Sequence, residues 1–282
     1  MKNIFFYSSV LVFVFLQTPV AFCFQADLKQ PEINNELLGF IKEHLGVSSY
    51  GNYMGGKKVG WDTDEIKLIK LNGVEVVSQV SESYFKALFG GNKTEVIDRT
   101  EVFYSLVGKG EILLIKSFHL ENGAKKTREL NLQKGGLTLV TTTQNRLDEK
   151  KVSKPKENLS MQMDLASWLK SKRNKGDVFD CFSTSVEEDD LNVPTRYIYK
   201  SKKNIQVTGG DLMVHEVDQE THGALFYSLL ENNGRLHYGR MGKIIEYRLE
   251  SNDVAKKLDN DLVDLIQISA VTLDKKLGDP VK

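Results

Sequence analysis

The chain is poor in cysteine, with two residues of this type, Cys23 and Cys181, among 282. Cys23 lies at the end of a predicted export signal, so the mature chain would keep Cys181 alone and could form no internal disulfide. A disulfide-rich scaffold is therefore excluded, and packing must hold the fold together. A lone cysteine is more often a small buried hydrophobic residue than a nucleophile.

The sequence also lacks an excess of charge of either sign. Lysine and arginine together number 38, aspartate and glutamate also number 38, and the formal net charge is zero. Binding to nucleic acid or to an anionic membrane commonly depends on an excess of basic residues. We therefore expect neither nucleic acid nor an anionic membrane surface as a partner.

Long apolar runs are missing beyond the N-terminus, whereas a membrane-spanning helix takes about 20 apolar residues. The N-terminus has the features of an export signal: Lys2, the mostly apolar run Ile4–Leu16, and small residues at Ala21 and Cys23. We predict a signal peptide at residues 1–23 and an exported protein, periplasmic or extracellular, with no membrane span after cleavage. Lipidation of Cys23 is a less favoured alternative because the preceding Phe22 is bulky, and an uncleaved anchor is another.

The segment Tyr50–Trp61, YGNYMGGKKVGW, indicates a β-hairpin. Glycine at both central positions, Gly55-Gly56, allows the positive φ angles of a tight primed turn. Strand-like segments separated by glycine turns continue to Thr143 and resume between Phe179 and Leu249. We predict a mainly β (α+β) fold built from two antiparallel half-barrel or sandwich-like sheets with a few short helices.

Three short helices are expected, at Ile33–Leu45, Met163–Lys172 and Asp253–Leu258, and the first of them has a clear apolar face. The segment Ser81–Phe89 is compatible with a helix or a strand. The charged stretch Lys150–Asn158 lacks apolar periodicity and predicts a linker. It divides the mature chain into a β-rich domain with a leading helix, 24–150, and a second β-rich domain with short helices, 151–282.

The hairpin GNYMGGKKVGW resembles a "Y-x-x-Gly-x-Lys-x-Gly-aromatic" hairpin that precedes the catalytic domain of bacterial exported transglutaminase-like proteins. Ser228–Leu258 is similar to a strand, an Asn-Gly turn, an "I-E-x-R" strand and a helix of the same region. Ile268–Pro280 looks like the family's connector to its enzyme domain. The resemblance spans Tyr50–Pro280 and implies an N-terminal, non-catalytic β-rich region. Because the papain-like domain would follow the connector and is absent, it implies an accessory module or the truncated first half of an enzyme.

Cys181, His215 and Asp218 imitate the order of catalytic residues in that family. Chemistry would need a thiolate at Cys181, His215 as its base and an acid that orients the imidazole. The interval from Cys181 to Pro194 is too short for the helix that carries the family's nucleophile, and acidic neighbours disfavour a thiolate. We predict no catalytic residues and favour a non-enzymatic protein. A cysteine-dependent transglutaminase-like or peptidase activity is the alternative.

Two clusters of histidine and acidic residues are interpreted as solvent-exposed segments. The histidines and acids at His215, Glu216, Asp218, Glu220 and His222 fit a solvated hairpin better than a metal site, since successive strand residues point to opposite faces. The acidic run Glu187–Asp190 lacks the spacing of a calcium loop.

Two glycine-lysine clusters are candidates for phosphate binding, and one set of aromatic residues is a candidate for a ligand cage. Gly55–Lys58 and Gly108–Gly110 lack the Walker pattern of a phosphate-binding loop, and we interpret them as turns. Tyr50, Tyr53 and Trp61 are more often core residues than a ligand cage. The sequence therefore predicts no metal, no cofactor and no catalytic residue.

The leading hypothesis is an exported, non-enzymatic binding or accessory module of the bacterial cell envelope. Its partner would be an envelope protein, a peptide or an amphiphile. The alternative is a carrier whose curved sheet covers a lipid-like or lipoprotein ligand. The sequence specifies neither the ligand nor the oligomeric state.

Overall fold

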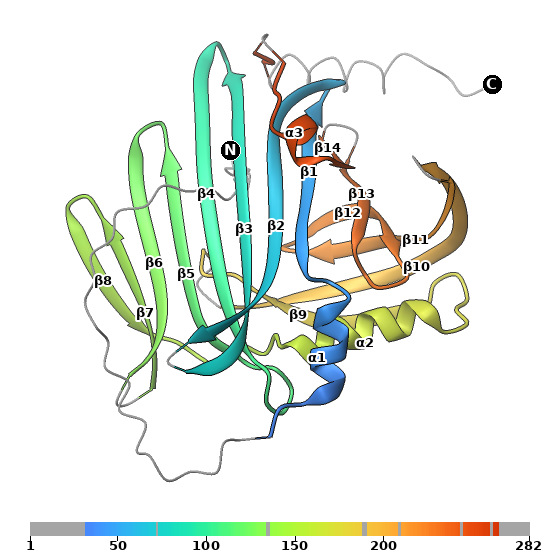
Figure 1. Cartoon of the computed structure of the whole chain (residues 1–282). Helices are drawn as coiled ribbons and strands as arrows, with labels where there is room; N and C mark the ends of the chain where they lie inside the picture. Colours follow the sequence, from blue (N-terminus) through green and yellow to red (C-terminus); the bar gives the residue numbers. More distant parts are fainter. Residues whose placement is uncertain are drawn as a thin grey trace.

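The computed structural model describes residues 32–71, 73–133, 136–187, 191–207, 210–242, 245–259 and 262–264. The predicted signal peptide, the acidic positions 188–190 and the connector-like segment Ile268–Pro280 lie outside these ranges. The described chain is mainly β with a few short helices, which confirms the predicted class (Figure 1). None of its helices has both the length and the apolar composition needed to cross a membrane.

The strands fall into two arms. The first arm contains β1 (Gly46–Met54), β2 (Lys57–Leu71), β3 (Val74–Phe89), β4 (Asn92–Ser105), β5 (Ile112–Glu121), β6 (Ala124–Gln133), β7 (Gly136–Thr143) and β8 (Arg146–Lys151). The second arm contains β9 (Val178–Thr184), β10 (Asn192–Val207), β11 (Gly210–Thr221), β12 (Ala224–Glu231), β13 (Leu236–Met241) and β14 (Ile245–Glu250). The helices are α1 (Asn35–Lys42), α2 (Leu159–Lys170) and α3 (Asn252–Ala255).

All 14 of these strands belong to one antiparallel sheet, with the order β8-β7-β6-β5-β4-β3-β2-β1-β14-β13-β12-β11-β10-β9. The two sheets expected from the sequence are therefore the two arms of a single sheet. They join where β1 pairs with β14, from Ser49 opposite Glu250 to Met54 opposite Ile245. Strands of the two arms run in clearly different directions because the sheet twists and curls (Figure 1).

The hairpin that joins β1 to β2 matches the sequence prediction. Its turn residues Gly55 and Gly56 have φ angles of 57° and 81°, which residues with a side chain rarely adopt. The ambiguous segment Ser81–Phe89 is part of strand β3.

The helices begin where a polar side chain caps them. Asn34 accepts hydrogen bonds from the backbone N–H groups of Glu36 and Leu37 at the start of α1. Asn158, the last residue of the predicted linker, caps α2, which begins at Leu159. The first two linker residues, Lys150 and Lys151, belong to strand β8. All three expected helices are present, with bounds shifted by a few residues.

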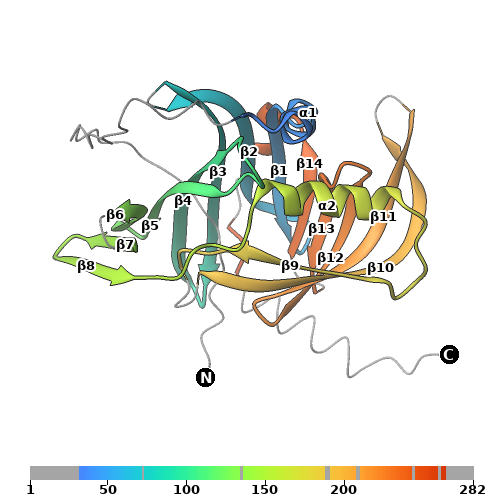
Figure 2. The same cartoon turned by 90° about the horizontal axis from the view of Figure 1, so that it is seen from below.

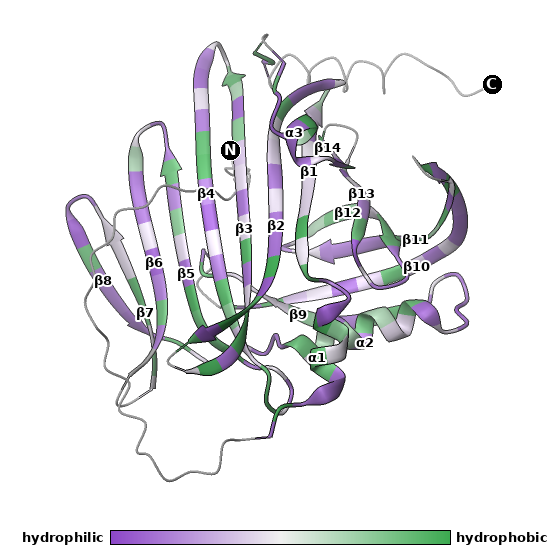
Figure 3. Ribbon diagram, in the orientation of Figure 1, coloured by the Kyte–Doolittle hydropathy of each residue, from purple (hydrophilic) through white to green (hydrophobic). Residues whose placement is uncertain are grey.

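Both longer helices pack on the same face of the sheet, here called the inner face (Figure 2). Leu37 and Ile41 of α1 contact Val77 and Tyr104 of the first arm. On the second arm, α2 buries Trp168 and Leu169 against Tyr199, Val217 and Leu230. Both helices carry hydrophobic residues between hydrophilic ones (Figure 3), and the buried residues include Leu37 and Ile41 of α1 and Leu169 of α2.

The sheet curls until its far end returns to the first arm. Val186 and Leu191, in the connection between β9 and β10, pack against Ile115, Leu130 and Leu139 on β5, β6 and β7. The two arms are thus in contact through side chains as well as through the β1–β14 pairing.

On the opposite, outer face, a buried ion pair lies over the junction of the arms. Lys58 Nζ is 2.6 Å from Glu250 Oε2 and donates to the Val254 carbonyl at 2.7 Å. Lys58 is 6% exposed, and the Tyr53 hydroxyl donates to the same carboxylate. Gly51 leaves room for this pair, since a Cβ there would lie 2.5 Å from Glu250 Oε2. The ion pair therefore connects β2, β14 and α3.

Candidate functional site

Two neighbouring rows of polar side chains cross the inner face of the first arm. Paired residues on adjacent antiparallel strands point to the same face, so the strand register gives each row directly. The first row is Tyr50, Asp62, Ser83, Asp98, His119, Lys126 and Thr143. The second row is Ser48, Asp64, Ser81, Thr100, Ser117, Arg128 and Thr141.

Apolar clusters border the polar rows on both sides. Met54, Phe85 and Val96 belong to one cluster, which also contains Val263 from beyond α3. Ile115 and Leu130, with the residues that pack on them, form the other border. The polar rows therefore occupy the middle of a face that is otherwise used for the core.

The acidic end of the rows lies on β2. Asp62 and Asp64 are half-buried, and the Ser81 hydroxyl donates to Asp64 Oδ1 at 2.5 Å. Burial raises the pKa of Asp62 to about 7, and the neighbouring Ser83 and Asn52 side chains counter only part of that rise. Burial also raises the pKa of Asp64. Within the described ranges, neither carboxyl has a basic side chain as an ion-pair partner.

Asn52 adds a buried polar group beside Asp62. It is 3% exposed, and its Oδ1 atom has no hydrogen-bond partner among the described residues. Its strand partner is Gly60, where the missing side chain lets the backbone of β3 approach closely. An amide oxygen left unpaired in a protein interior is unfavourable by about 1–3 kcal/mol, so this arrangement is not explained by stability.

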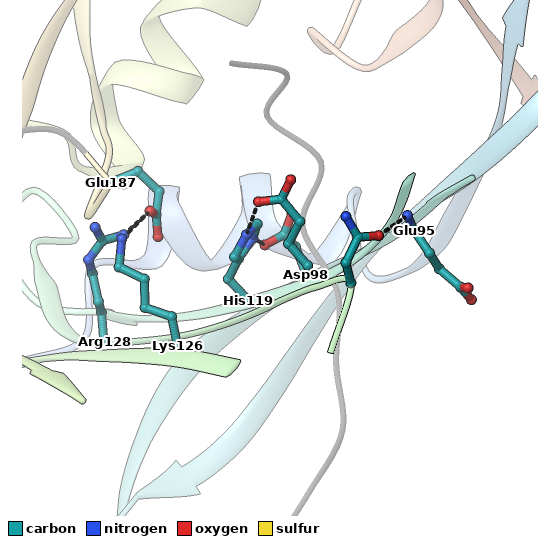
Figure 4. Close-up of polar contacts among 8 residues, drawn as sticks. Glu95, Asp98, His119, Lys126, Arg128 and Glu187 are labelled. Carbon is teal, nitrogen blue, oxygen red and sulfur yellow. Dashed lines mark hydrogen bonds and ion pairs between the residues drawn. The ribbon is translucent and has the colours of Figure 1, made fainter. Parts of the chain in front are cut away.

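The other end of the rows is basic, and its side chains are paired with acidic residues. His119 Nδ1 contacts the Asp98 carboxylate, which raises the pKa of His119 (Figure 4). Lys126 and Arg128 both form ion pairs with Glu187, which lies beyond β9 (Figure 4). The positive charges are therefore paired, whereas the carboxyls on β2 are not.

Replacing Asp62 by asparagine is expected to stabilise the protein at about pH 8 and to change little at about pH 4. The raised pKa means that the folded protein keeps a proton that the unfolded chain releases above its ordinary value of 3.8. Stability therefore falls as the pH rises from about 4 to 7, and asparagine removes that loss. We expect a gain of about 1–3 kcal/mol at pH 8, reduced from the full shift because water reaches the group.

Chemical denaturation at both pH values measures this effect. Asp164→Asn is the matched control, because Asp164 is exposed on α2 and should change stability little at either pH. A loss of stability in Asp62→Asn at pH 8, or an equal change at both pH values, would contradict the assignment of a buried, unpaired carboxyl.

The residues that imitate a catalytic triad are not brought together. Cys181 on β9 pairs with Thr195 on β10, and Thr195 pairs with Thr221 on β11. His215 precedes Thr221 by six residues on β11, so it lies about 20 Å along the strand from the position level with Cys181. Asp218 is paired with Lys200. Burial, with the charges of Glu157 and Asp180, raises the pKa of Cys181 to about 11, so a thiolate is disfavoured.

The remaining candidates have structural roles. His215 is buried with Nε2 2.8 Å from Asn232 Oδ1, and His222 occupies the β11–β12 turn with a φ of 50°. Across the described ranges, no three His, Cys, Asp or Glu side chains are placed to hold a metal ion. The Lys109 and Gly110 carbonyls accept hydrogen bonds from the first turn of α2.

The aromatic residues of the first hairpin are distributed over both faces. Tyr50 is buried on the inner face, and its hydroxyl donates to the Leu236 carbonyl at 3.2 Å. Trp61 lies on the outer face, where it stacks on Tyr84 with 6.3 Å between ring centres. They form no common cage.

The polar rows were missed in the sequence because the strand centres are polar on both faces. A signal was present: neighbouring strands each carry two polar residues at positions i and i+2, as in Asp62/Asp64, Ser81/Ser83 and Lys126/Arg128. Only the register shows that these pairs line up on the face that α1 and α2 cover.

Comparison of this chain with protein-family models, curated proteins and solved structures gives no match. The function therefore has to be argued from the residues of the site.

Proposed function

We propose that the protein is an exported, non-enzymatic binding module of the bacterial cell envelope and that the polar rows are its ligand-binding surface. One observation carries the proposal: Asp62 and Asp64 are half-buried and lack an ion-pair partner among the described residues. Apolar residues at such positions would stabilise the sheet better. Groups that lower stability in this way are typical of binding and catalytic sites.

A binding role fits the site better than a reaction does. The rows and the adjoining Asn52 offer carboxyl, hydroxyl and amide groups without an activated nucleophile, and the imidazole within the rows, His119, is held by Asp98. The separation of Cys181 from His215 gives no support to a cysteine-dependent activity. Export and a place in the cell envelope rest on the N-terminal signal and on the sequence resemblance.

The carrier alternative has less support from the described residues. The apolar clusters beside the rows are already packed against α1, α2 and Val263. A ligand with polar groups, such as a peptide or the polar part of an envelope component, matches the groups that remain. We therefore place a polar ligand on the first arm.

Retention of an envelope component by the full chain tests the proposal. The tagged protein is purified from periplasm under mild conditions and examined by native mass spectrometry. Thr100→Phe would place a bulky ring in the second polar row and should abolish retention. Thr127→Phe is the matched control, because Thr127 is also half-buried but points to the outer face. Wild type without any bound component, or equal retention by both variants, would overturn the proposal.

A further inference from the structure

Resting on the proposed function, we propose that Asp62, Asp64 and the side-chain oxygen of Asn52 recognise a positively charged nitrogen group of the ligand, such as an ammonium or a guanidinium. The three side chains lie on neighbouring strands β1 and β2 and on one face of the sheet. They lie at the β2 end of the polar rows, where Arg235 interacts with Tyr50 and neither carboxyl has an ion-pair partner among the described residues.

The spacing of the carboxyl groups fits a nitrogen cation. Asp62 and Asp64 are two residues apart on one strand, so their Cα atoms are about 6.6–6.8 Å apart and their side chains point the same way. Two N–H···O bonds of about 2.8 Å on opposite sides of one nitrogen group bridge a gap of this kind. An ammonium or guanidinium also offers several donors and no acceptor, which complements a site made of oxygens.

Asn52 supplies independent support. Its side chain is 3% exposed, it lies close enough to Asp62 to lower the pKa of that carboxyl, and its Oδ1 atom remains without a donor in the described structure. A neutral ligand oxygen would leave that atom unpaired, whereas an N–H donor would satisfy it.

A bare metal ion suits the site less well. Calcium takes about six to eight oxygen ligands, and the described residues hold no group of three acidic or histidine side chains arranged around one point. The serines beside the acids donate instead of coordinating, since the Ser81 hydroxyl hydrogen bonds to Asp64.

The charge distribution along the rows also favours a cation at β2. Lys126 and Arg128 would attract an anion at the other end, but both are paired with Glu187. A ligand that carries a positive group therefore meets unpaired carboxyls at one end and cations that are already paired with an acid at the other.

Calorimetric titration of the full chain at about pH 8 with acetyl-trilysine amide tests the assignment. We expect saturable binding, at least about tenfold weaker in Asp62→Asn/Asp64→Asn. The control Asp164→Asn/Asp253→Asn changes the net charge equally at exposed positions and should bind like wild type. Equal binding by the double variant, or equal binding of acetyl-triglutamate amide, would overturn the proposal.

A parallel titration with calcium chloride separates the two kinds of cation. Calcium binding that depends on Asp62 and Asp64, without binding of the lysine peptide, would overturn the assignment to a nitrogen group. The double variant should remain folded, because asparagine removes the unfavourable buried charge. If it still retains the native envelope component, the cation assignment fails while the binding function stands.

Discussion

Replacing Lys58 by methionine is expected to lower the free energy of unfolding by about 3–5 kcal/mol. Methionine fills a similar volume, but the Glu250 carboxylate loses its cation and the Val254 carbonyl loses its donor. Glu250 is only 13% exposed, so water replaces little of this interaction. Urea denaturation of the purified variant measures the loss.

Two further variants separate the buried charge from general damage. Lys58→Met/Glu250→Gln removes both charges and should recover part of the loss. Lys67→Met breaks an ion pair with Glu65 whose lysine is 53% exposed, and it should change stability by less than about 1 kcal/mol. Similar losses for Lys58→Met and Lys67→Met would contradict the role given to the buried pair.

Alanine at position 60 is expected to destabilise the protein by about 3 kcal/mol or more. A Cβ at Gly60 would lie 2.2 Å from the backbone oxygen of Tyr84 and 3.2 Å from Cα of Phe85. Both atoms belong to the backbone of β3, so relief requires that β2 and β3 separate. Thermal unfolding followed by circular dichroism is the measurement.

The matched control uses the same substitution with the opposite expected sign. Gly39 lies inside α1, and a Cβ there meets nothing within 4 Å. Gly39→Ala should therefore stabilise the protein by about 0.5–1 kcal/mol, because alanine favours the helix. Wild-type stability of Gly60→Ala would show that β2 and β3 are not in such close contact.

The mainly β class of the fold could be predicted from local sequence patterns. The pairing of β1 with β14, which connects the two arms, could not be predicted from them. Glycine turns such as Gly55-Gly56 and alternating apolar residues predicted antiparallel strands because both are local features. The pairing of β1 with β14 depends on contacts between distant segments, and nothing in either segment specifies its partner. Two sheets were therefore expected where one continuous sheet is present.

The candidate site was less predictable than the fold. Asp62 and Asp64 look like ordinary solvent-facing residues, because polar residues alternate on both faces of β2. Their burial follows from the curl of the sheet and from the residues that pack around it. The first hairpin, by contrast, can now be explained residue by residue: Gly51 makes room for Lys58, and Gly60 allows β3 to approach.

The pairing of β1 with β14 has a consequence for folding kinetics. Ser49 and Glu250 are about 200 residues apart, so this contact closes a very long loop, whereas each arm is built from hairpins that form locally. Until β14 arrives, β1 is an unprotected edge that can pair with another chain. We infer that joining of the two arms is the slow step and that aggregation during refolding starts at this edge. Peptides that copy Ile245–Glu250 should then suppress it.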